Sequence, residues 1–191
     1  MKRYHLVLLI FVCQICTINV KAQIRDKGSN YLELLTGVPI LSGESFSNWK
    51  NGEHYFGASY AIGTTRGNYH RITLSFKREY LLDYAIKSSS PNYENITFKY
   101  GYEKTLAKGK NHLSYFGLLY GLGVGMEKLN NSYNTNIGNE NIYPLLTVGL
   151  NFEKFLTRNF ALFSRIEADA TIINISQKTK GTLAFGIKVG L

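Results

Sequence analysis

Residues 71–80 read R-I-T-L-S-F-K-R-E-Y and alternate between apolar and polar or charged side chains. Ile72, Leu74 and Phe76 fall on one side of an extended chain, and most of the charged residues fall on the other. Successive side chains of a β-strand point to opposite faces, so this stretch predicts a strand with one apolar face and one charged face. A single strand of this kind fits a water-soluble sheet as well as a membrane barrel. The number of such strands along the chain, and the lengths of the segments between them, help to distinguish the two.

The same alternation recurs along the rest of the chain. Together with the opening stretch it predicts strands at 30–38, 54–63, 69–82, 93–106, 112–126, 142–155, 160–171 and 181–191. Short turns join some of them, near 65–68, 107–111 and 156–159. Longer polar segments join the others, near 39–53, 83–92, 127–141 and 172–180.

An even number of strands, with short turns at one end and longer loops at the other, is typical of outer-membrane barrels. Strands of about ten residues are long enough to cross the apolar layer of a bilayer when tilted. In lipid the sheet must also close, because every backbone amide needs a partner. The sequence therefore predicts an all-β fold, an eight-stranded antiparallel up-and-down transmembrane barrel with its amino terminus and short turns in the periplasm.

A soluble barrel with an apolar interior is the alternative fold. The faces opposite the apolar stripes carry acidic and basic residues in equal number, together with Gly and Thr. Small residues favour placing these faces inside, because eight strands enclose only enough room for side chains. Charges in such an interior must be paired. We therefore expect interior ion pairs that leave no pore, formed by Arg71, Lys77, Lys99, Arg165 and Lys188 with Glu79, Glu103, Glu153, Glu167 and Asp169.

The amino terminus reads as a secretory signal peptide at 1–22, followed by a barrel domain at 23–191. Lys2 and Arg3 precede a short apolar run, and small residues stand before the expected cleavage after Ala22. An uncleaved transmembrane anchor would need about 20 apolar residues, and polar residues interrupt this run too early. Lipidation at Cys13 or Cys16 is a weaker alternative, because neither cysteine follows a small residue.

Composition narrows the chemistry of the mature chain. Both cysteines lie in the predicted signal, so disulfides, cysteine nucleophiles and thiolate metal sites are excluded once it is removed. The formal net charge of +9 falls to about +6 after cleavage. Such an excess attracts nucleic acid, anionic lipid or lipopolysaccharide phosphates without choosing among them.

Aromatic residues are abundant, and amphipathic tyrosine rings suit the interfaces of a membrane. We expect such interfacial girdles to contain Tyr60, Tyr69, Tyr80, Tyr93, Tyr100, Tyr102 and Tyr143.

The candidates for catalysis are weak. A lipid hydrolase would need a Ser-His-acid set on one face. Ser75 and Glu79 share the charged face, but His54, His70 and His112 stand near turns or loops and are expected at the rims. The glycines of Gly121–Gly125 alternate within a strand, so they do not form a phosphate loop. The sequence predicts no catalytic, cofactor-binding or metal-binding residues, no cofactor and no nucleic-acid site.

Several stretches resemble the TraO proteins of conjugative transposons, and the resemblance covers nearly the whole mature chain. It is carried by Tyr55–Ala58, by Ile96–Tyr102, by the turn F-L-T-R-N-F at 155–160 and by F-G-I-K at 185–188. The resemblance implies an outer-membrane component of DNA transfer between cells, with other conjugation proteins and outer-membrane lipid as partners. It supplies no catalytic residues. A generic adhesion or envelope-stability barrel and, more remotely, an outer-membrane lipid hydrolase remain alternatives.

Overall fold

The computed structural model describes residues 25, 27–42, 54–80, 92–130, 140–171 and 179–191. The predicted signal peptide at 1–22 lies outside the described residues. Among those described, no helix has the length and apolar character needed to cross a bilayer.

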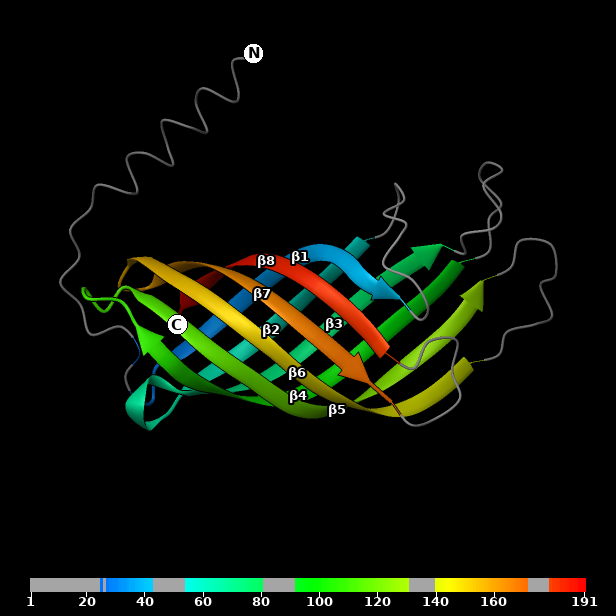
Figure 1. The fold of residues 1–191 in the computed structure, drawn as a ribbon, viewed down its shortest axis with the longest axis horizontal. Coiled ribbons are helices and arrows are strands. Elements are labelled where there is room, and N and C mark those ends of the chain that lie inside the picture. The colour runs from blue at the N-terminus through cyan, green and yellow to red at the C-terminus, as the bar shows by residue number, and fades with distance from the viewer. Residues whose placement is uncertain (1–24, 26, 43–53, 81–91, 131–139, 172–178) are drawn as a thin grey trace, which may run out of the picture.

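Eight antiparallel strands form one closed barrel, which confirms the predicted fold class. Each strand pairs with the next in sequence, and the last pairs with the first, between Tyr31 and Ser42 on one side and Lys180 and Gly190 on the other. Their bounds are β1 Asn30–Ser42, β2 His54–Gly63, β3 Tyr69–Tyr80, β4 Asn92–Lys108, β5 Ser114–Asn130, β6 Glu140–Thr157, β7 Phe160–Ala170 and β8 Thr179–Gly190. Figure 1 shows the strands tilted around a common axis.

The short connections gather at one end of the barrel, which also holds the carboxyl terminus (Figure 1). A 3-10 turn, η1 at Thr65–Gly67, links β2 to β3. Its Arg66 and Gly67 both have positive φ, a conformation that glycine adopts without strain. We call this end the short-turn end, and the opposite end the long-loop end.

The apolar stripes face outward along every strand. Leu74, Phe98 and Leu122 are each more than half exposed, whereas Thr73, Lys99 and Thr97 on the alternate positions are buried. The strand period of two places the two sets on opposite faces. A barrel of this kind exposes an apolar wall that suits lipid and encloses a polar interior.

Several strands run further than the sequence indicated. Segments 39–42, 127–130, 140–141 and 179–180 belong to strands β1, β5, β6 and β8, although the sequence placed them in loops. Pro39 ended the first of these predicted strands and polar residues ended most of the others, but the sheet continues through these positions. The remaining parts of these predicted loops lie outside the described residues.

Candidate functional site

The barrel interior holds a set of paired, buried charges, which we call the ionic core. It consists of Arg25, Glu33, Arg71, Lys99, Glu103, Glu127, Glu153, Arg165, Glu167, Asp169, Lys180 and Lys188. All but Asp169 are buried, and Asp169 is partly buried.

Glu33 of β1 stands at the centre of the ionic core. Arg71 of β3 donates to its Oε1 at 2.9 Å, and Arg165 of β7 donates to its Oε2 at 2.7 Å. The ammonium of Lys188 on β8 lies 3.3 Å from the same carboxylate. One buried carboxylate therefore joins four strands through three cations.

Glu103 of β4 and Glu153 of β6 extend the ionic core toward the short-turn end. Arg71 donates to Glu103 from Nη1, and the side-chain amide of Asn151 donates to Glu103 at 3.1 Å. Lys188 donates to Glu153 at 2.9 Å. These contacts connect β4 and β6 to the Glu33 cluster.

A second group of charges lies toward the long-loop end. Lys99 of β4 donates to Glu167 of β7 at 2.5 Å and lies 3.3 Å from Asp169. Lys180 of β8 donates to Glu127 of β5 at 2.7 Å. Arg165 links this group to the centre, because its Nη1 lies 3.4 Å from Glu167.

Arg25 enters the barrel from the segment before β1. Its guanidinium lies 2.9 Å from Glu103 and donates to Glu153 at 2.8 Å. It also donates to the carbonyl of Gly67 at 3.1 Å and to the hydroxyl of Thr105 at 3.0 Å. Burial alone lowers the pKa of Arg25, but the carboxylates of Glu153 and Glu103 raise that pKa above its ordinary value. These contacts hold the side chain of Arg25 inside the short-turn end.

Aromatic rings pack around the charges at this end. Tyr31, Tyr69, Tyr115 and Phe155 form one buried cluster. The guanidinium of Arg25 lies 4.5 Å from the ring centre of Tyr69 and 4.4 Å from that of Tyr115, and the ammonium of Lys188 lies 3.6 Å from the Tyr69 ring. A cation over an aromatic face is stabilised by the ring quadrupole. The rings therefore fill the space that the ion pairs leave.

Two glycines make room for the interior groups. A Cβ at Gly117 would lie 2.7 Å from the carboxylate of Glu103, and one at Gly125 would lie 2.3 Å from the ring of Tyr143. Both glycines lie on β5, where the sequence alternates Gly with large outward residues. These two inward positions of β5 therefore have no side chain, and the side chains of Glu103 and Tyr143 occupy the space beside them.

Eight of the ten predicted interior residues lie within the ionic core. They are Arg71, Lys99, Glu103, Glu153, Arg165, Glu167, Asp169 and Lys188. Lys77 is buried and lines a cavity near the long-loop end, together with Asn95 and Tyr143. The backbone of Glu79 pairs with Tyr93 in the sheet, but its side chain lies outside the described part of the chain.

Sequence reasoning missed four charged members of the ionic core. Glu33 alternates with Leu32 and Leu34, so strand period alone places it inward. Glu127 and Lys180 were assigned to loops because the predicted strands stopped short of them. Arg25 lies outside every strand, so strand alternation does not predict whether its side chain points into the barrel.

The predicted tyrosine girdles are only partly correct. Tyr60 and Tyr100 are exposed on the outer wall, and Tyr102 is half-buried. Tyr69 and Tyr143 were assigned wrongly, because both are buried inside the barrel. Each shares the inward register of its strand, as Tyr69 does with Arg71. The side chains of Tyr80 and Tyr93 lie outside the described residues.

The geometry does not assemble a hydrolase site from the described residues. Ser75 lies in the interior, with its hydroxyl 2.6 Å from that of Thr97. His70 lies on the outer wall, where its ring nitrogen is 2.6 Å from the hydroxyl of Tyr100. His112 stands in the connection between β4 and β5, at the short-turn end. The backbone of His54 pairs with Arg78 at the opposite end.

The ionic core can hold the barrel together and close it. Several of its pairs, such as Lys99–Glu167 and Lys180–Glu127, cross the interior between strands that are not neighbours, so they act as braces. Buried ions are tolerated only when they are paired and hydrogen-bonded, as most are here. Side chains fill the interior of an eight-stranded barrel when they reach across it in this way.

No protein-family model matches the sequence, and no curated protein matches it. Among solved structures, the attachment invasion locus protein Ail of Yersinia pestis is similar, with a TM-score of 0.57 and 12% identity over 87% of this chain and 100% of that one. Neisserial surface protein A is similar with a TM-score of 0.54 and 14% identity, over 85% of this chain and 97% of that one. At these identities the likeness concerns the fold. The fold is that of an eight-stranded outer-membrane barrel.

Proposed function

We propose that the chain is a non-enzymatic barrel of the outer membrane that serves as an accessory component of a conjugative transfer apparatus. The ionic core supports the proposal that the barrel is neither an enzyme nor a channel, because its paired charges occupy the interior. A strand of DNA cannot pass through an interior filled in this way. The barrel would therefore contribute surface and anchorage to such an apparatus.

The exposed apolar wall supports the location in a membrane. Outward side chains such as Leu74, Leu122 and Leu146 are each more than half exposed. Contact between so large an apolar surface and water is unfavourable, whereas contact with lipid is not. Barrels of this type place short turns in the periplasm and longer loops outside. In that orientation Arg25 lies on the periplasmic side, close in sequence to the predicted cleavage after Ala22.

The assignment to conjugation rests on the resemblance to TraO proteins described above. Its stretches fall on structural parts of the barrel, including the end of β6 with the β6–β7 turn at Arg158 and Asn159, and the second half of β8 at Phe185–Lys188. These stretches lie in the wall and in a turn of the barrel, so the resemblance supports a barrel fold shared with TraO proteins. Partner proteins would be other transfer proteins that meet the barrel at its rims or on its outer face.

A transfer assay tests this role. Deletion of the gene should lower the frequency of transposon transfer, and the wild-type chain supplied in trans should restore it. Unchanged transfer after deletion would reject the conjugation role and favour a general envelope barrel.

Membrane location is tested separately. The protein should fractionate with outer membranes and should migrate differently on a gel before and after heating, as folded barrels do. Recovery in the soluble fraction would reject the barrel's location whatever the transfer assay shows.

A further inference from the structure

The exposed charged side chains at the short-turn end are all basic among the residues that the structure describes. We call them the basic rim: Lys27, Arg66, Lys104, Lys108, Lys110, Lys154 and Arg158. The acidic residues of this end, Glu103 and Glu153, are buried in the ionic core. At the opposite end the outward charges include acid as well as base, as in the Arg78–Glu94 ion pair.

Two residues of the basic rim lie on the wall of the barrel and not on its end. Lys104 continues the outward row of β4 two residues beyond Tyr102, and Lys154 continues that of β6 two residues beyond Phe152. Two residues of strand span roughly 7 Å. Both lysines are exposed, and no described acidic residue pairs with them.

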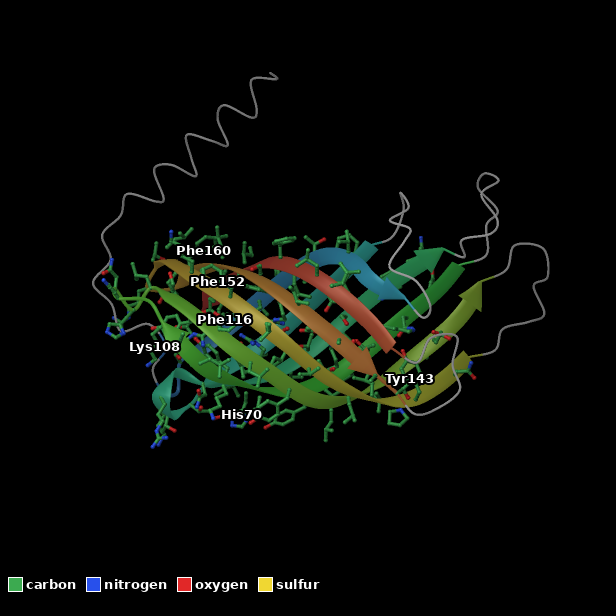
Figure 2. The ribbon with its side chains drawn as sticks, viewed as in Figure 1. His70, Lys108, Phe116, Tyr143, Phe152 and Phe160 are labelled. Atoms are coloured by element: carbon green, nitrogen blue, oxygen red, sulfur yellow. The ribbon has the colours of Figure 1, made fainter. Side chains whose placement is uncertain are left out.

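Aromatic and apolar residues lie between these lysines. On β5, Leu118 pairs with Lys104 of β4, and Phe116 pairs with Phe152 of β6. Figure 2 shows Phe116 and Phe152 toward the end of the barrel at which Lys108 lies. The patch therefore combines an apolar floor for acyl chains with cations at its edge.

The position of the lysines indicates the chemistry of the ligand. A lysine at the edge of an apolar wall extends its stem along the lipid and places its ammonium among the headgroups. A periplasmic protein or a nucleic acid would approach along the barrel axis, whereas Lys104 and Lys154 project sideways from the wall. In the proposed orientation this edge lies in the periplasmic leaflet, which consists of phospholipid.

We propose that Lys104 and Lys154, flanking Phe116 on the wall of β4–β6, form a binding site for the headgroup phosphate of an anionic phospholipid. The site rests on the proposed membrane location and is independent of the role in conjugation. The neighbouring cations of the basic rim strengthen the local positive potential. A zwitterionic lipid gains less there, because its own cationic group offsets the attraction.

Native mass spectrometry of the purified protein in detergent tests the proposal. Phosphatidylglycerol and phosphatidylcholine with identical acyl chains are the probes. The wild type should retain phosphatidylglycerol preferentially, and Lys104→Gln/Lys154→Gln should weaken that binding about tenfold or more. Lys104→Arg/Lys154→Arg should preserve it, because the charge is kept.

Lys128→Gln is the control at the other end, since Lys128 is exposed on the outward face of β5 near the long-loop end. It should leave phosphatidylglycerol binding unchanged. Heat-modifiable migration of each variant shows that a loss of lipid is not a loss of fold. Equal retention of the two lipids by the wild type would overturn the proposal, as would equal retention of phosphatidylglycerol by the wild type and the double glutamine variant. Binding of a polyglutamate or an oligonucleotide at the rim, with phosphatidylglycerol unbound, would overturn it too.

Discussion

Arg71 and Glu33 meet at 2.9 Å in the barrel interior, although their strands β3 and β1 are separated in the sheet by β2. Backbone hydrogen bonds join only neighbouring strands, so this ion pair braces the barrel in a direction that the sheet does not. Removing one partner leaves the other charge buried. Loss of either partner leaves the other to its remaining ion pairs, Glu33 with Arg165 and Lys188, and Arg71 with Glu103.

Arg71→Met should destabilise the barrel by about 1–3 kcal/mol, because Glu33 and Glu103 lose a shared cation but keep Arg165, Lys188 and Arg25 as partners. Urea unfolding in lipid vesicles measures the free energy. The double variant Glu33→Gln/Arg71→Met should lose less than the sum of the two single changes. Additive losses would show that the two residues do not interact.

Arg25→Ala should cost about 1–3 kcal/mol, since Glu103 and Glu153 keep Arg71 and Lys188 as partners. It should also release the segment before β1, so that a protease cleaves there faster. Lys27→Ala is the matched control, because Lys27 is exposed two residues away. Equal protease resistance of Arg25→Ala and the wild type would contradict the fixed position of Arg25.

Leu74→Arg should destabilise the inserted barrel by about 2–4 kcal/mol if the outward face meets the bilayer near its midplane. Leu74→Phe keeps the side chain apolar and should be tolerated. Equilibrium unfolding from vesicles compares the two variants with the wild type. Equal stability of the arginine and phenylalanine variants would place this face outside the lipid.

Gly117→Val should destabilise the barrel by about 1–3 kcal/mol, because its side chain would enter space that the Glu103 carboxylate occupies. The adjacent change Leu118→Val alters an outward residue and should cost less. The same unfolding experiment measures both. A neutral Gly117→Val variant would mean that Glu103 can be displaced without loss of its ion pairs.

The outward and inward faces could be predicted because strand period is a local property. The alternation that placed Ile72 and Leu74 on one face also defines the positions of Arg71, Lys99 and Arg165. Applied strictly, it would have found Glu33, Tyr69 and Tyr143 as interior residues as well. Those errors came from assigning residues by type and not by register.

Other features depend on tertiary structure. Glu127 and Lys180 lie near the ends of β5 and β8, where the polar composition predicted loops. They form an ion pair between strands that are far apart in sequence. Arg25 depends on how the segment before β1 turns into the barrel. Which cation faces which carboxylate depends on barrel geometry, since the sequence defines only the side on which each residue lies.

The central claim is that the apolar stripes face lipid while the ionic core is enclosed. Because both cysteines lie in the predicted signal peptide, the mature chain offers a cysteine-free background for fluorescent labelling. A label at Leu74→Cys in reconstituted vesicles should be quenched by a lipid-bound nitroxide and not by aqueous iodide, while Thr73→Cys should resist labelling in the folded state. Quenching of the Leu74 label by iodide alone, with ready labelling at Thr73, would contradict the account.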